Sequence, residues 1–220
     1  LPRHDDPLTI SPTCIPISAS GTISQQSSPA TPTTDCQQAL SDLGIYFTIA
    51  SNPMDSPKDH PELICDIQDP IYVEGTILGV NFRYDSMNNA AKPIFASCPL
   101  ALAMAKTAEM LAENDITDVL HLGVYNCRTI GGTNKLSQHA LANALDIRAL
   151  RHSNGQTYTV FDDWEKDTAF PTTTSGAFLK WFVETLYLDW VYNIILTPDH
   201  NKAHEDHFHL DLTEGSHFLD

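Results

Sequence analysis

The stretch HEDHFHLDL, residues 204–212, narrows most strongly what this chain can fold into. A β-strand places alternate residues on opposite faces, and this stretch alternates with that period of two. One face is apolar and holds Phe208, Leu210 and Leu212. The other face is polar and holds His207, His209 and Asp211. The apolar face is expected to pack on a core, while the polar face points either into a cleft or, on an edge strand, into solvent.

A second motif, SQHALANALDIRAL, places His139 seven residues before Asp146. The strand that begins there puts Asp146 and Arg148 on one face and apolar residues on the other. Two histidines and one carboxylate from two strands form a set of three ligands that suits zinc and leaves a fourth position for water. The two motifs together predict a catalytic type of zinc site.

The other patterns predict helices and strands without regular alternation. A helix capped by Ser97 and an amphipathic helix near residues 178–186 are mixed with strand segments, and a hairpin is expected to turn at Glu74 and Gly75. This mixture is typical of the α+β class. We expect a small antiparallel sheet that carries the zinc site and is flanked by helices.

The first part of the chain, residues 1–34, is rich in Ser, Thr and Pro. Such a composition buries too little apolar surface to fold, so it predicts a linker, and the folded domain is expected to cover residues 35–220. Because the first residue is Leu1 and not Met, we expect a processed piece of a longer precursor whose targeting signal is lost.

The chain carries a net charge of -16, from 12 Lys plus Arg against 28 Asp plus Glu. A surface of this sign repels phosphate backbones, so no nucleic acid is expected as a partner. No apolar run approaches the roughly 18 to 20 residues that cross a bilayer, so no transmembrane segment is expected either.

Five cysteines stand at scattered positions without a C-x-x-C pair. This pattern favours disulfides in an oxidising compartment, although five reduced thiols remain an alternative. We expect at least one disulfide among Cys36, Cys65, Cys98 and Cys127, and three pairings are open.

The motifs SQHALANALDI and HEDHFHLDL resemble the extensin-like C-terminal domain family, and more distantly the zinc peptidases of the lysostaphin and D-alanyl-D-alanine metallopeptidase group. That group shares S-x-H-x(6)-D followed by H-x-H. The resemblance runs from about Cys36 to Asp211. It implies that zinc is bound by His139, Asp146 and His209.

The resemblance also implies roles around the metal. His207 would be the catalytic histidine, His204 a further histidine of the active site, and Arg128 the group that stabilises a developing oxyanion. Ser137 would help to hold the substrate. Asp206 ranks below the histidines, because on an alternating strand it would point with the apolar face, away from the metal.

By resemblance, the protein is expected to hydrolyse amide bonds in peptidoglycan stem peptides or cross-links, in the bacterial periplasm or outside the cell. Two departures from the family are visible. Relatives usually have glycine at the position of Ala142, and they tend to carry a cysteine near FLKWFVETLYL, where this chain has none.

Other interpretations stay open from the sequence. The zinc could stabilise a binding or signalling module without turnover, as in the hedgehog signalling domain. Cys98, at a helix N-terminus, could serve a thiol hydrolase. Asp211 fits either a carboxylate that orients a ligand histidine or a plain surface carboxylate. His121 fits either a group that supports the metal ligands without binding the metal or, as we expect, a core histidine with satisfied hydrogen bonds.

Overall fold

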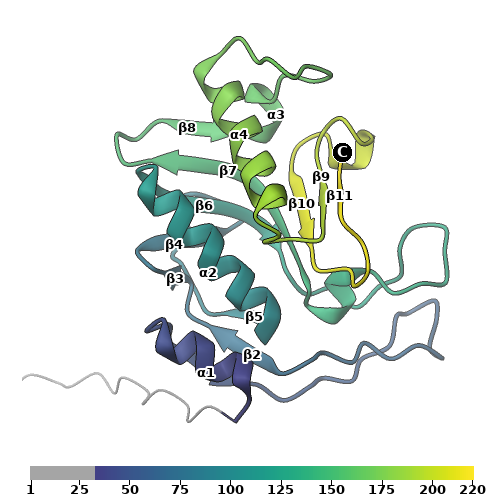
Figure 1. Ribbon diagram of the computed structural model, residues 1–220. Helices are drawn as coiled ribbons and strands as arrows, with labels where there is room; N and C mark the ends of the chain where they lie inside the picture. Colours follow the sequence, from purple (N-terminus) through teal and green to yellow (C-terminus); the bar gives the residue numbers. More distant parts are fainter. Residues whose placement is uncertain (1–32) are drawn as a thin grey trace, which may run out of the picture.

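The computed structural model describes residues 33–220, so nearly all of the predicted linker, and Cys14, lie outside the described part. The described chain is α+β, as predicted (Figure 1). Its helices are α1 (Asp35–Asp42), α2 (Cys98–Glu113), α3 (Val160–Asp163) and α4 (Thr174–Leu188), with 3-10 turns η1 (Gln138–Leu141) and η2 (Lys202–His204). Its strands are β1 (Phe47–Ile49), β2 (Pro70–Val73), β3 (Thr76–Ile77), β4 (Val80–Tyr84), β5 (Ile94–Ser97), β6 (Ile116–Gly123), β7 (Ala144–His152), β8 (Thr157–Thr159), β9 (Ile194–Leu196), β10 (Phe208–Asp211) and β11 (Phe218–Leu219).

The strands form two sheets. A three-stranded sheet has the order β1-β2-β5, and an eight-stranded sheet runs β11-β9-β10-β7-β6-β4-β3, with β8 paired to β7. The main sheet is larger than expected and not wholly antiparallel, because β4 pairs with β6, and β11 with β9, in parallel. A parallel pair needs a long crossover, and the segment through β5 and α2 provides it between β4 and β6.

The prediction of a hairpin that turns at Glu74 and Gly75 is wrong. β2 pairs with β1 and β5 in the small sheet, and the tight turn lies four residues further on, between β3 and β4. Leu78 and Gly79 both adopt positive φ there, at 48° and 86°. Gly75 serves a different purpose, since a Cβ at this position would lie 2.4 Å from the carbonyl oxygen of Lys92.

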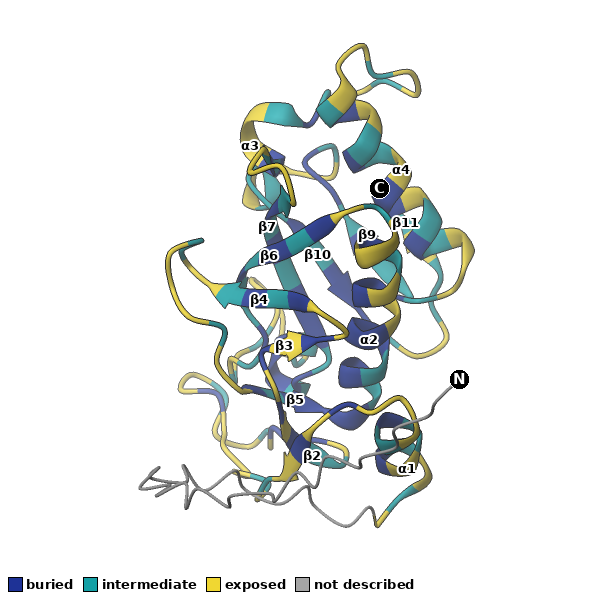
Figure 2. Ribbon diagram, turned by 90° about the vertical axis from the view of Figure 1, so that its left-hand side faces the viewer, coloured by how far each residue is buried: buried dark blue, intermediate teal, exposed yellow. Residues whose placement is uncertain are grey.

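Helices α2 and α4 cover one face of the main sheet (Figures 1 and 2). The Ser97 side chain caps α2 as predicted, accepting from the backbone N–H of Leu100. The ring of Phe208 on β10 lies 6.2 Å from that of Phe182 on α4, so the apolar face of the HEDHFHLDL stretch does pack on the core. Its partner face, which carries His209, therefore faces away from the helices.

Two disulfides join Cys36 to Cys98 and Cys65 to Cys127. The predicted disulfide is thereby confirmed, and one of the three open pairings is selected. Because Cys98 is bonded and fully buried, its interpretation as the nucleophile of a thiol hydrolase is wrong. Among the described residues, no helix is both long and apolar enough to span a membrane.

Candidate metal centre

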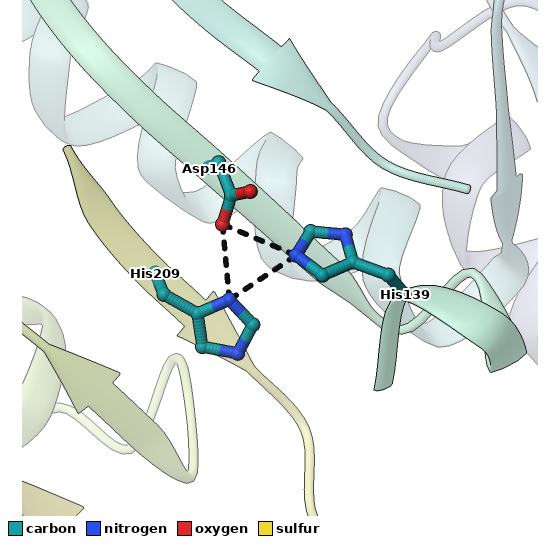
Figure 3. Close-up of side chains that lie close together, drawn as sticks. All are labelled: His139, Asp146 and His209. Carbon is teal, nitrogen blue, oxygen red and sulfur yellow. Dashed lines mark hydrogen bonds and ion pairs between the residues drawn. The ribbon is translucent and has the colours of Figure 1, made fainter. Parts of the chain in front are cut away.

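Three side chains converge on the exposed face of the main sheet: His139 from η1, Asp146 from β7 and His209 from β10 (Figure 3). Asp146 and His209 are directly paired across the two antiparallel strands. Nε2 of His139 lies 3.2 Å from Oδ1 of Asp146 and 3.2 Å from Nδ1 of His209, and the last two atoms are 2.9 Å apart. The predicted ligand residues are thus brought together.

The backbone around His139 is shaped to aim its ring. The hydroxyl of Ser137 accepts from the backbone N–H of His139 and begins the 3-10 turn. The turn ends at Ala142, whose φ of 50° lies in the left-handed region. A residue with a Cβ pays roughly 1–2 kcal/mol for this conformation. The glycine usual in relatives would adopt it without strain, so the departure at Ala142 keeps the backbone shape at a cost in stability.

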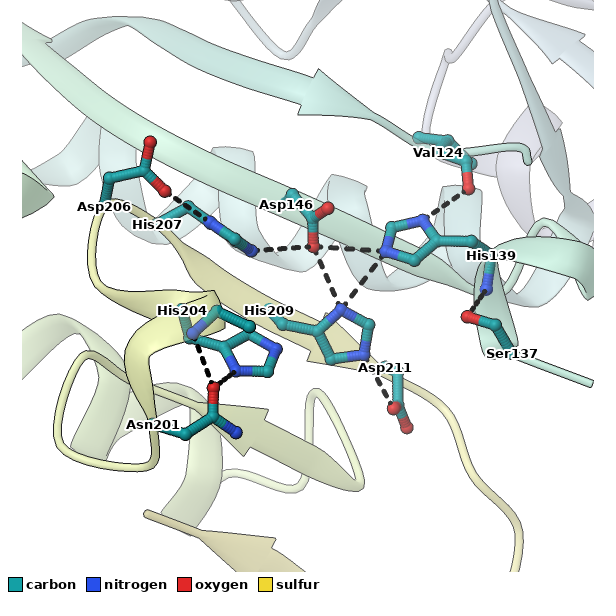
Figure 4. Close-up of polar contacts among 11 residues, drawn as sticks. Val124, Ser137, His139, Asp146, Asn201, His204, Asp206, His207, His209 and Asp211 are labelled. Atoms are coloured by element: carbon teal, nitrogen blue, oxygen red, sulfur yellow. Dashed lines mark hydrogen bonds and ion pairs between the residues drawn. The ribbon is translucent and has the colours of Figure 1, made fainter. Parts of the chain in front are cut away.

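Each ligand histidine is oriented by a second hydrogen bond on its other nitrogen (Figure 4). Nδ1 of His139 donates to the carbonyl oxygen of Val124 at 2.8 Å, and Nε2 of His209 donates to the carboxylate of Asp211 at 2.9 Å. Since these acceptors fix the ring protons, neutral imidazoles leave lone pairs on Nε2 of His139 and Nδ1 of His209. Asp211 is 5% exposed, so it is no plain surface carboxylate.

When both imidazoles are neutral, the site points three lone-pair atoms at one another, an arrangement that a cation stabilises and that a proton on His209 relieves when no cation is bound. Burial acts to raise the pKa of Asp146, but hydrogen bonds with His139 and His209 outweigh it and hold that pKa well below its usual range. Burial acts to lower the pKa of His209, but Asp146 and Asp211 raise it to about 9. A site of this kind gives up a proton when a metal binds.

The donor set fits a tetrahedral metal ion. With bonds of about 2.0 Å to nitrogen and oxygen, tetrahedral zinc places its ligand atoms about 3.3 Å apart. The separations of 2.9 to 3.2 Å come close to this without any rearrangement. His139, Asp146 and His209 could hold such an ion and leave a further coordination position free.

The structure places His207 beside the triad but outside it. Its Nε2 lies 3.8 Å from Oδ1 of Asp146, and its Nδ1 donates to Asp206 at 2.9 Å. The prediction that Asp206 points away from the metal is wrong, because β10 begins only at Phe208 and the residues before it form a turn. Asp206 instead orients His207 and also pairs with Arg148 at 2.7 Å.

His204 follows on the same side of the site (Figure 4). Its ring centre lies 5.3 Å from that of His207 and 5.9 Å from that of His209. Nδ1 of His204 donates to Oδ1 of Asn201 at 3.0 Å, which leaves Nε2 as the acceptor. Burial, followed by the neighbouring histidines, lowers the pKa of His204 to about 4 and keeps the ring neutral at pH 7.

A cavity of about 800 Å³ opens on the other side of the triad and is lined by His139, Asp146 and Arg128. Arg128 is exposed and, among the described residues, has no carboxylate partner. Its guanidinium makes one hydrogen bond there, a long one of 3.4 Å to the Thr129 carbonyl. The guanidinium is thus free to meet a ligand. Ser137, in contrast, is 5% exposed and serves as the cap described above, so its role in substrate binding stays a prediction.

His121 also lines the cavity, where sequence reasoning expected a satisfied core histidine. It is buried, but its Nδ1 has no hydrogen-bond partner among the described residues. Burial lowers its pKa to about 4, against the opposing charge of Asp146. The expectation of satisfied hydrogen bonds is therefore wrong, and no local pattern around VLHLG signals it.

Fold and site together define an α+β protein with a candidate metal centre on the open face of its main sheet. The chain belongs to the family described as Extensin-like protein C-terminus, which matches residues 34–218. None of the curated proteins or solved structures compared with the chain matches it.

Proposed function

We propose that this protein is a zinc-dependent peptidase that hydrolyses amide bonds in peptidoglycan stem peptides or cross-links. One observation carries the proposal: three potential metal-ligand atoms converge beside an open cavity, flanked by two histidines that are not part of the converging set. The H-x-H and S-x-H-x(6)-D motifs resemble those of the lysostaphin and D-alanyl-D-alanine metallopeptidase group, which supplies the substrate class.

His139, Asp146 and His209 would hold the zinc. When bound, zinc supplies Lewis-acid polarisation of a carbonyl and makes hydroxide available at neutral pH. A structural zinc site has four protein ligands, whereas three leave room for a substrate. The cavity beside the triad supports the catalytic interpretation over a purely structural ion.

His207 is the candidate for proton transfer. Because its Nδ1–H is held by Asp206, its Nε2 carries the lone pair and points toward the triad. A neutral imidazole in this orientation can take a proton at Nε2 and deliver it to the leaving amine. The charge of Asp206 stabilises the imidazolium in between, as a carboxylate does in other catalytic pairs.

Arg128 would act on the opposite side, from the cavity wall. A guanidinium without a carboxylate partner can pair with the oxygen of the scissile carbonyl as negative charge develops on it. The two disulfides fit an oxidising compartment, which supports placing the activity in the bacterial periplasm or outside the cell.

The test is digestion of purified peptidoglycan by the zinc-loaded protein, with mass spectrometry of the released fragments. We expect new amine and carboxyl ends in the peptides, and no release by His139→Ala, Asp146→Ala or His209→Ala variants, which should also lose zinc. Stoichiometric zinc without any release would favour the non-catalytic metal-stabilised module instead.

A further inference from the structure

An aromatic row leads out of the cavity onto the three-stranded sheet. Tyr125 and Phe95 line the cavity, and their ring centres lie 5.2 Å apart. Phe95 in turn lies 5.3 Å from Tyr72, its direct partner across β2 and β5. Tyr72 is 47% exposed, so the row ends in solvent. We call these three side chains the aromatic track.

The outer end of the track points away from the core, while Phe95 and Tyr125 pack partly against it. On β2, Ile71 and Val73 are fully buried, while Tyr72 between them points out. Alternation along the strand therefore presents the aromatic ring to solvent while its neighbours hold the sheet on the core. A large ring kept on this face serves no need of the core.

The inner end of the track is braced. The hydroxyl of Tyr125 donates to Asp55 at 2.8 Å, and Asp55 pairs as a bridge with Cys65. Cys65 is bonded to Cys127, two residues after Tyr125, which closes a ring of contacts. A ring side chain fixed in this way loses little freedom when a ligand stacks on it.

The charge and the area of the surface around the track exclude most classes of ligand that bind to aromatic side chains. Stacked nucleic-acid bases need a cationic groove for the backbone, and the chain has a net charge of -16. A protein partner needs roughly 800 Å² from each side, which three partly covered rings cannot supply. A neutral sugar ring needs only a flat aromatic face with polar groups nearby, and Asn88, Asn89 and Asn126 line the same cavity.

We propose that the aromatic track binds a neutral carbohydrate chain and holds it alongside the candidate metal centre. This inference rests on the proposed function, because the stem peptides of peptidoglycan are attached to a chain of amino sugars. A sugar stacked on Tyr72 would leave the peptide attached to the chain free to enter the cavity from the end that Phe95 and Tyr125 line.

Binding without turnover tests the track. The probes are a tetramer and a hexamer of β-linked N-acetylglucosamine, both neutral, titrated calorimetrically, with a free stem peptide as comparison. We expect Tyr72→Ala to weaken binding of both carbohydrates about tenfold, the loss of one stacked ring, while Tyr72→Phe keeps it. Phe161→Ala, which removes a 62% exposed ring on α3, is the matched control and should bind like the wild type.

Tyr72→Leu distinguishes loss of the ring from a folding defect, because leucine keeps apolar bulk on the strand but removes the flat ring. This variant should lose carbohydrate binding as the alanine variant does. Wild-type protein that binds neither carbohydrate, or Tyr72→Ala that binds as tightly as wild type, would overturn the proposal. Carbohydrate binding by protein that releases no peptide would instead refute the proposed peptidase and leave the track standing.

Discussion

Two aspartates, each 2.9 Å from one histidine of the H-x-H motif, should have separable effects. Asp211 holds Nε2 of His209, a proposed ligand, and its other oxygen accepts from the backbone N–H of Thr213 at 2.8 Å. In Asp211→Asn, the amide oxygen can keep the Thr213 bond, which turns the NH2 group toward His209. The imidazole proton is then driven to Nδ1, the atom that faces the metal.

Loss of such an orienting partner typically weakens metal binding 10- to 100-fold, or about 1.4 to 2.7 kcal/mol. We expect Asp211→Asn to fall in this range when it competes for zinc with a fluorescent chelator. Asp206→Asn is the matched control, because it changes the partner of His207, which is not a proposed ligand. Its zinc affinity should stay within about twofold of wild type, while peptide release falls.

The reasoning would be refuted if both variants weakened zinc binding equally, or if Asp211→Asn bound zinc as the wild type does. Either result would mean that the protonated nitrogen of His209 is not set by Asp211. Thermal unfolding of the two metal-free variants serves as a check that neither has lost its fold.

Three further predictions concern other parts of the molecule. Arg128→Ala should lower kcat on peptidoglycan by roughly a hundredfold while the zinc content stays intact. Lys135 is an exposed cation nearby, and Lys135→Ala should leave kcat unchanged. Equal kcat values for the two variants would show that Arg128 takes no part in the mechanism. Replacing Cys36 and Cys98 by alanine opens a loop of 62 residues and should cost about 4 kcal/mol in urea unfolding, and an unchanged midpoint would contradict this. Hydrogen bonds from Thr172 and Thr173 lower the pKa of Glu165 to about 2. The Tm of the wild type should therefore exceed that of Glu165→Gln at pH 6, and the difference in Tm should shrink as the pH falls from about 4.3 toward 2. A difference in Tm that does not depend on pH would show that the charge of Glu165 is irrelevant to stability.

The candidate ligands could be predicted because they depend on local periodicity. Asp146 and His209 lie on strands whose apolar neighbours Leu145, Ile147, Phe208 and Leu210 all point to the core, and alternation then fixes the face of the ligands. The pairing that sets them opposite each other, His209 with Asp146, follows once both apolar faces are buried in one sheet.

Asp206 could not be placed in this way, because alternation applies only within a strand. The strand begins at Phe208, and the preceding turn rotates Asp206 toward His207. The missing partner of His121 Nδ1 depends on which segments distant in the sequence pack around this ring. Sequence periodicity contains no information about such neighbours.

The placement of the disulfides has a consequence for how the molecule is cross-linked. Both close loops that end at or before Cys127, and they interleave, since Cys65 lies between Cys36 and Cys98. All three candidate ligands lie beyond Cys127, and an ion joining His139 to His209 would close a loop of 70 residues, similar to the 62 of each disulfide. A reductant would then break the cross-links of the first part of the chain, whereas a chelator would remove the cross-link of the second part. Metal supply in the surrounding compartment would set how long the C-terminal part survives proteases, whether or not substrate is present.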